Sequence, residues 1–156
     1  MKCRLFFYFL ELLKLNYKEF KEEQEKKANE FTEGKLFFAF GTTEEGVKRK
    51  LKEDYNVESS EVVGIGAGTY IKKEDFKEVM QFFDQQAKEF KEFSLANLYD
   101  VLTYEMANHE LEISLSYSYR SFLTDWLELT EEEIEDNKEE IEKAIKDYRI
   151  DFYKHN

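Results

Sequence analysis

Apolar residues recur three and four positions apart across residues 73–93, and this helical spacing constrains the fold more than any other feature of the chain. Because an α-helix turns once every 3.6 residues, side chains at this spacing share one face. Residues 17–31 carry a thinner apolar stripe on a highly charged background, so we expect a second, solvated helix there. The apolar positions of the first helix are Phe76, Val79, Met80, Phe83, Ala87 and Phe90.

Three shorter segments predict a small sheet. Residues 35–40 (KLFFAF) form an apolar run that ends at Gly41, which is typical of a buried strand. Residues 61–71 (EVVGIGAGTYI) are β-branched and contain several glycines, and they predict a strand or a bent hairpin. Residues 111–119 alternate between apolar or aromatic and polar side chains, which predicts a strand with one face in water.

Further helices are expected from their start signals. Thr42 with Glu45, and Thr130 with Glu133, have the spacing of capping boxes, in which the two residues satisfy each other's backbone N–H groups. Residues 121–129 predict a short helix, and a helix capped by Ser94 or Asn97 is expected to run to about His109. The expected inner faces are Val47, Leu51 and Tyr55 after the first box, and Ile134, Ile141, Ile145 and Tyr148 after the second.

These elements predict a helix-rich α+β fold, with a small, mainly antiparallel sheet packed against several helices. A chain of 156 residues without a linker favours a single acidic domain over residues 1–156. The lone Cys3 allows no intramolecular disulfide and favours a reducing, cytoplasmic setting. The apolar run LFFYFL near the start is too short to span a membrane, and we expect it to form a buried first element.

Negative charge is concentrated in one segment. The formal net charge is −12; residues 1–93 hold 19 acidic and 17 basic side chains, whereas residues 94–147 hold 15 acidic and 4 basic ones. A field of this sign repels nucleic acid and attracts basic protein surfaces, so we expect a basic protein partner and no direct nucleic-acid binding. The candidate partner-binding residues are Asp125, Glu128, Glu131, Glu132, Glu135, Asp136 and Glu139, with Tyr117 and Tyr119 as aromatic contacts. The alternative interpretation is a solvated helix face that keeps the chain soluble.

One stretch, LTYEMANHELEI at residues 102–113, raises the question of a metal site. On a helix, Glu105 and His109 lie four residues apart on one face and could supply two ligands. The zinc-protease pattern lacks its second histidine, and the di-iron pattern requires Glu and His three apart, twice. We therefore expect no catalytic residue, metal or cofactor here, and interpret the stretch as a helix end followed by a strand.

The glycine-rich run at residues 64–68 also invites a nucleotide-binding interpretation. A dinucleotide fingerprint would need glycine where Thr69 stands, and a phosphate loop would need a Gly-Lys-Ser/Thr ending that is absent. Glycine in a strand more often marks a bulge or a close backbone approach. We expect a structural role for this run.

Four segments resemble a family of small, largely uncharacterised proteins from phages and mobile elements of Gram-positive bacteria. They are FFAF at residues 37–40, GIGAGTYI at 64–71, YEMANHE at 104–110 and LTEEE at 129–133, and the resemblance covers roughly residues 28–148. The chain departs from the family's pattern at Ala67 and Thr69, and in the Ser- and Tyr-rich stretch before Ser121. The resemblance implies a phage accessory protein, a class in which inhibitors of host defence are common, including anti-CRISPR proteins. It implies no catalytic residue.

Three functions remain open from the sequence. The first is a non-enzymatic inhibitor that binds a host CRISPR effector, or another nucleic-acid-handling nuclease, through an acidic surface that mimics nucleic acid. The second is a phage accessory or regulatory protein that binds another protein through an apolar patch. The third is a small metal-dependent enzyme built on Glu105, His109 and Glu110.

Overall fold

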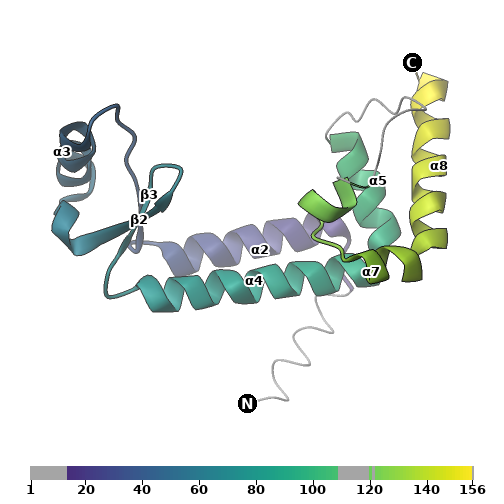
Figure 1. Ribbon diagram of the computed structural model, residues 1–156, viewed down its shortest axis with the longest axis horizontal. Helices are drawn as coiled ribbons and strands as arrows, with labels where there is room; N and C mark the ends of the chain where they lie inside the picture. The colour runs from purple at the N-terminus through teal and green to yellow at the C-terminus, as the bar shows by residue number, and fades with distance from the viewer. Residues whose placement is uncertain (1–13, 109–119, 121, 156) are drawn as a thin grey trace, which may run out of the picture. The chain divides into compact units, whose positions relative to one another are not determined.

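The computed structural model describes residues 14–108, 120 and 122–155, and it confirms a helix-rich α+β architecture with a small antiparallel sheet (Figure 1). The chain divides into two compact units. The first unit combines the residues up to 22 with those from 88 onward, and the second contains residues 23–87. Whether the chain behaves as one domain in solution stays a prediction.

The second unit contains the sheet. Strands β1 (Leu36–Phe38), β2 (Val62–Gly66) and β3 (Thr69–Lys72) pair antiparallel in the order β1-β3-β2. Helix α3 (Glu44–Tyr55) covers one face, and a 3₁₀ turn, η1 (Ser59–Glu61), leads into β2. The core between sheet and α3 consists of Phe37, Ala39, Leu51, Val57 and Val62, with Val47 and Tyr70 packed against it.

Helix α3 starts one residue later than predicted, so the capping box expected at Thr42 and Glu45 is wrong. Thr43 has extended backbone angles, and its hydroxyl accepts a hydrogen bond from the Gly46 N–H at 3.1 Å. In a capping box, a Glu side chain three residues after the cap bonds back to the N–H of the capping residue. Gly46 stands at that position and has no such side chain, so Thr43 caps the helix alone. At the other end Asn56 takes the left-handed conformation (φ 54°) and closes the helix.

The interpretation of residues 35–40 as a buried strand is only half right. Phe37 and Ala39 are buried against α3, but Phe38 and Phe40 are 52% and 59% exposed. Successive side chains of a strand point to opposite faces, and only one face of this end of the sheet is covered by α3. An unbroken apolar run in the sequence therefore does not show that both faces of the strand are buried.

The hairpin predicted at residues 61–71 is confirmed, and the conformation of its turn explains the glycines. Gly66, Ala67 and Gly68 all have positive φ, and the strand register shifts between Gly64 and Gly66. A Cβ atom on Gly68 would lie 2.4 Å from the ring of Phe40, so only glycine fits under that ring.

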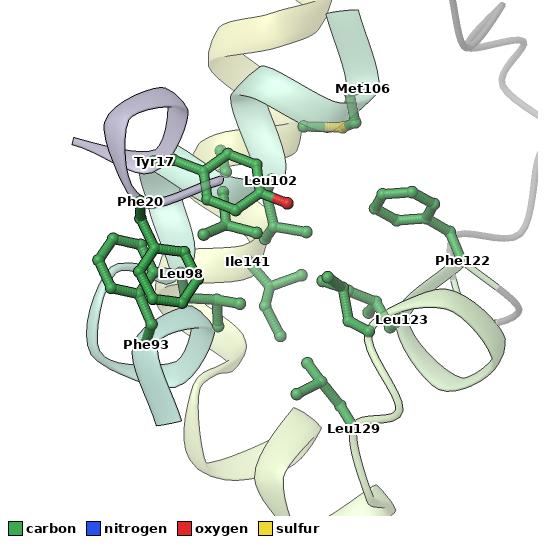
Figure 2. Packing of buried hydrophobic residues seen from close by; sticks show 13 residues of the cluster. Tyr17, Phe20, Phe93, Leu98, Leu102, Met106, Phe122, Leu123, Leu129 and Ile141 are labelled. Atoms are coloured by element: carbon green, nitrogen blue, oxygen red, sulfur yellow. The ribbon is translucent and has the colours of Figure 1, made fainter. Parts of the chain in front are cut away.

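The first unit is helical. It contains the start of α2 (Tyr17–Thr32), the end of α4 (Phe76–Ala96), α5 (Leu98–Asn108), a π-helical turn η2 (Phe122–Trp126), α7 (Glu131–Asp136) and α8 (Lys138–His155). Its core places Leu98, Leu102 and Met106 of α5 between the other helices, as Figure 2 shows. The rings of Phe20 and Phe93 stack in this core at a centroid distance of 4.0 Å.

Most helix predictions are confirmed, with shifted ends. The predicted helix at 17–31 is α2, and the one at 73–93 is α4, which begins at Phe76. The predicted continuous helix after Thr130 is wrong, because Asn137 divides it into α7 and α8. The side chain of Asn137 donates to the Glu133 carbonyl at 2.8 Å, which ends α7. The capping box of Thr130 and Glu133 is confirmed.

Two predictions remain, one for a further strand and one for membrane-spanning segments. The strand expected at residues 111–119 lies in the part of the chain that the structure does not describe. Among the helices that it does describe, none combines the length and the apolar character that crossing a bilayer requires.

Candidate functional site

The carboxylate of Glu105 on α5 is fully buried in the first unit. Lys21 Nζ on α2 lies 2.9 Å from Glu105 Oε1, and Asn108 Nδ2 donates to Oε2 at 3.4 Å. The Lys21 side chain is 39% exposed, so the cation reaches the carboxylate from the edge of the core. A buried carboxylate is costly unless it is paired and hydrogen-bonded. These contacts therefore account for Glu105 as part of the packing between α2 and α5.

Two tyrosines complete this polar cluster. The ammonium of Lys21 lies 5.4 Å from the ring centroid of Tyr17 and 5.2 Å from that of Tyr104. The Tyr17 hydroxyl is buried and has no hydrogen-bond partner among the described residues. Burial first, and then the neighbouring Glu105 carboxylate, raise the pKa of Tyr17 far above its usual value, so the phenol stays protonated.

The structure answers only part of the metal question. Helix α5 ends at Asn108, as predicted for this stretch, while His109 and Glu110 lie outside the described residues. Across residues 14–108 and 122–155, no group of three or more His, Cys, Asp or Glu side chains is placed to hold a metal ion. Glu105 is already engaged by Lys21, so it is not a free ligand.

The predicted acidic residues lie on exposed positions of the first unit. We use the name acidic surface for seven of them: Asp125, Glu128, Glu131, Glu132, Glu135, Asp136 and Glu139, all of which are exposed. They lie on η2, on the loop after it, on α7 and on the first turn of α8. Figure 1 shows α7 and α8 meeting at a bend. Tyr117 and Tyr119, the predicted aromatic contacts, lie outside the described residues.

Cations neutralise only part of the acidic surface. Glu131 pairs with Arg120, and Glu135 pairs with Lys138 at 3.3 Å. Glu132, Asp136 and Glu139 form no ion pair with any residue in the described ranges. A carboxylate without a nearby cation keeps its full charge available to a partner, since water screens but does not cancel it.

Three other acidic residues of this unit have structural roles. Glu133 accepts the Thr130 N–H at 2.8 Å and pairs with Lys91 at 3.0 Å. These two contacts, the backbone bond first, hold the pKa of Glu133 below its usual value. Glu140 accepts the Tyr99 N–H at 3.2 Å, and Asp147 accepts the Tyr99 hydroxyl at 2.9 Å, so both join α5 to α8.

The acidic surface ends early on α8. Residues 125–142 contain ten acidic side chains and one basic one, Lys138. Helix α8 as a whole contains five of each sign, and Lys143, Lys146 and Arg149 follow its acidic first turn. The concentrated charge is therefore confined to α7 and its flanks. It does not extend along one long helix, because the continuous helix predicted after Thr130 is divided at Asn137.

A different kind of surface lies on the second unit. Phe38, Phe40 and Ile65 are 52%, 59% and 40% exposed, and all three come from β1, β2 or the residues directly after them. Single exposed apolar residues are ordinary, but Phe38 at the end of β1 and Phe40 two residues later give two exposed aromatic side chains of the kind found at protein interfaces. The apolar contact expected from the sequence stays a prediction, and these side chains are the candidates for it.

Comparison with known proteins places the chain in a family. A model of a family of unknown function (DUF7659) matches residues 16–151. The chain belongs to this family. The match extends over α2 to most of α8, so it includes both units, the acidic surface and the exposed phenylalanines. No curated protein matches the chain, and no solved structure does.

Sequence reasoning missed the partner of Glu105. Lys21 lies 84 positions away, in a helix with several similarly spaced lysines, such as Lys18. Nothing local distinguishes Lys21, because its neighbour is determined by how α2 packs against α5. The spacing of Tyr17 and Lys21 on one helical face was the only available signal.

Proposed function

We propose that the protein is a non-enzymatic binding protein whose acidic surface engages a basic, nucleic-acid-binding surface of another protein. The observation that supports this function most is the exposure of all seven carboxylates of the acidic surface, of which Glu132, Asp136 and Glu139 form no ion pair within the described residues. Such a field attracts basic grooves and raises the rate of encounter with them.

The resemblance to phage proteins directs the choice of target. It implies an accessory protein, a class that includes inhibitors of host defence, so we propose a host defence nuclease, with a CRISPR effector as the first to test. Duplex DNA carries one charge per about 1.7 Å of its axis. Six residues of α7 extend over about 9 Å. The acidic surface thus matches a short piece of duplex and fills part of a groove that holds nucleic acid.

The test is competition between the protein and DNA on purified CRISPR effector nucleases. The triple variant Glu132→Lys, Asp136→Lys and Glu139→Lys reverses three charges that form no ion pair within the described residues. We expect it to lose at least tenfold in affinity for the effector, because like charges then face each other. Raising the salt to about 0.5 M shortens the screening length to about 4 Å, and it should abolish binding of the unaltered protein.

A matched control separates this surface from net charge. Glu25, Glu30 and Glu53 of the second unit are exposed and form no ion pair with described residues. Reversing these three changes the net charge by the same amount and should leave affinity within about twofold, because they are not part of the acidic surface and salt screens exposed charges. Equal loss in both triple variants, or competition with DNA that survives in the first one, would contradict the proposed surface.

The second candidate function uses the exposed phenylalanines. A phage accessory protein that binds through Phe38 and Phe40 would keep its partner at high salt, because burial of apolar surface does not depend on charge. A partner that is retained at about 0.5 M salt and lost in Phe38→Ser would favour this function over the first.

A further inference from the structure

A groove runs beside β2 in the second unit. Its volume is about 470 Å³, within the range of roughly 300–1,000 Å³ that is usual for ligand sites. It lies between the first half of α3 and the edge of the sheet, and its lining includes Thr42, Val47, Ser59, Val62, Gly64 and Tyr70. Since β2 is the last strand of the sheet, nothing pairs with it on the groove side among the described residues.

The backbone of β2 turns hydrogen-bonding groups toward this groove. The Lys73 N–H donates to the Glu61 carbonyl at 2.9 Å, and Val63 is the register partner of Ile71. In an antiparallel pair the residues alternate, so Glu61 and Val63 bond to the β3 side. The N–H and C=O of Gly64 therefore point away from β3, and no described residue bonds to either.

The opposite edge of the sheet is closed. On β1 the outward groups belong to Phe38, and one side chain occupies both. The Tyr55 hydroxyl donates to the Phe38 carbonyl at 3.2 Å and accepts from the Phe38 N–H at 3.4 Å. Covering an edge in this way prevents another strand from pairing there. Among the described residues β1 has this protection and β2 does not, so the β2 edge is the one offered to a partner strand.

The floor of the groove suits an uncharged side chain. A Cβ atom on Gly64 would lie 3.3 Å from the Tyr70 ring, so the ring packs against the glycine, which itself adds no side chain to the strand edge. Val47 and Val62 add apolar surface, while Thr42 and Ser59 supply hydroxyl groups. The charged residues at the groove, Glu44 and Lys48, pair with each other.

We propose that an extended peptide segment of a partner protein binds in this groove as a fourth strand beside β2. One residue of the segment exchanges hydrogen bonds with the N–H and C=O of Gly64. An apolar or hydroxyl side chain of the segment enters the space between α3 and Tyr70. Main-chain pairing of this kind provides affinity, and the pocket for alternate side chains provides specificity. The site is separate from the acidic surface and does not depend on the proposed function.

The experiment uses a phage-displayed library of random linear peptides, panned against the full-length protein. The blocking variant is Thr42→Arg, which places a long side chain in the groove from an exposed position. Its control is Ser60→Arg, which adds the same charge at an exposed position that does not line the groove. Circular dichroism establishes that both variants keep the fold, and synthetic copies of enriched peptides are titrated by calorimetry.

The proposal predicts enriched peptides that lose at least tenfold in affinity with Thr42→Arg and keep it with Ser60→Arg. The amide of Gly64 should exchange quickly with deuterium in the free protein, and a bound peptide should slow this exchange by at least tenfold. No enriched peptide, affinity indifferent to Thr42→Arg, or unchanged exchange at Gly64 would overturn the proposal. Self-association that Thr42→Arg abolishes would overturn it too, because it would assign the β2 edge to a second copy of the chain.

Discussion

Replacing Lys21 with methionine should destabilise the protein by leaving the buried carboxylate of Glu105 without its cation. Methionine has nearly the same length as lysine, so the change removes charge and leaves most of the packing. Breaking a fully buried ion pair from one side costs about 3–5 kcal/mol. The Lys21 side chain is 39% exposed, so water reaches the vacated position, and we expect the lower value of about 2–3 kcal/mol.

The assay is urea unfolding followed by circular dichroism, with thermal unfolding as a second measure. A loss of about 2–3 kcal/mol corresponds to a decrease in Tm of about 5–10 °C for a chain of this size. Lys18→Met is the control on the same helix. Lys18 is 69% exposed and lies 3.9 Å from Glu22, so its loss should cost less than about 0.5 kcal/mol.

A double-mutant cycle tests the cause. Glu105→Gln keeps the shape and an acceptor oxygen while it removes the charge, and it leaves a lysine that water can solvate, so it should cost about 1 kcal/mol. In the double variant with Lys21→Met no buried charge remains, and the total loss should be at least about 1 kcal/mol smaller than the sum of the single losses. Additive losses, or equal effects of Lys21→Met and Lys18→Met, would refute the reasoning.

Two further predictions concern a helix cap and a turn. Glu133→Gln should destabilise the protein at neutral pH, because the pKa of Glu133 is held below its usual value by the Thr130 N–H first and by a lysine second. This stabilisation is present above pH 4.5 and is lost as the pH falls through the lowered pKa of Glu133. Urea unfolding of both proteins at pH 7 and at pH 3 measures the difference. Gly34 and Gly68 both have φ 71°, so alanine at either position should cost about 1–2 kcal/mol. Only Gly68→Ala adds a clash with Phe40, and its loss in urea unfolding should exceed that of Gly34→Ala by at least about 1 kcal/mol; equal losses would show that the ring moves aside without cost.

Local sequence patterns predicted which helices and strands form better than they predicted where each one begins and ends. The spacing of apolar residues identified α2 and α4, and the glycine-rich stretch identified the β2–β3 hairpin. The start of α3 at Thr43 and the break at Asn137 were missed. Both depend on which of several adjacent polar side chains reaches a backbone group, and neighbouring residues such as Thr42 and Thr43 look alike in sequence.

The candidate site could also be predicted only in part from the sequence. Charge is a property of composition, so the sequence alone identifies the acidic segment, and the exposed positions of Glu132 and Asp136 agree with it. The sequence does not separate these residues from Glu133, which caps α7 and pairs with Lys91. That separation decides which carboxylates can be changed without disturbing the fold.

The sequence by itself determined the helix-rich α+β class and the concentration of charge, because the spacing of apolar residues and the local charge can both be read from short stretches of the chain. Only the tertiary structure decided that Glu105 is buried against Lys21, that Phe38 and Phe40 face outward, and that the described residues form a groove beside Gly64. Each of these depends on segments distant in sequence that pack together. Burial and pairing follow from the sum of many weak contacts across the fold, and no single stretch of sequence contains that sum.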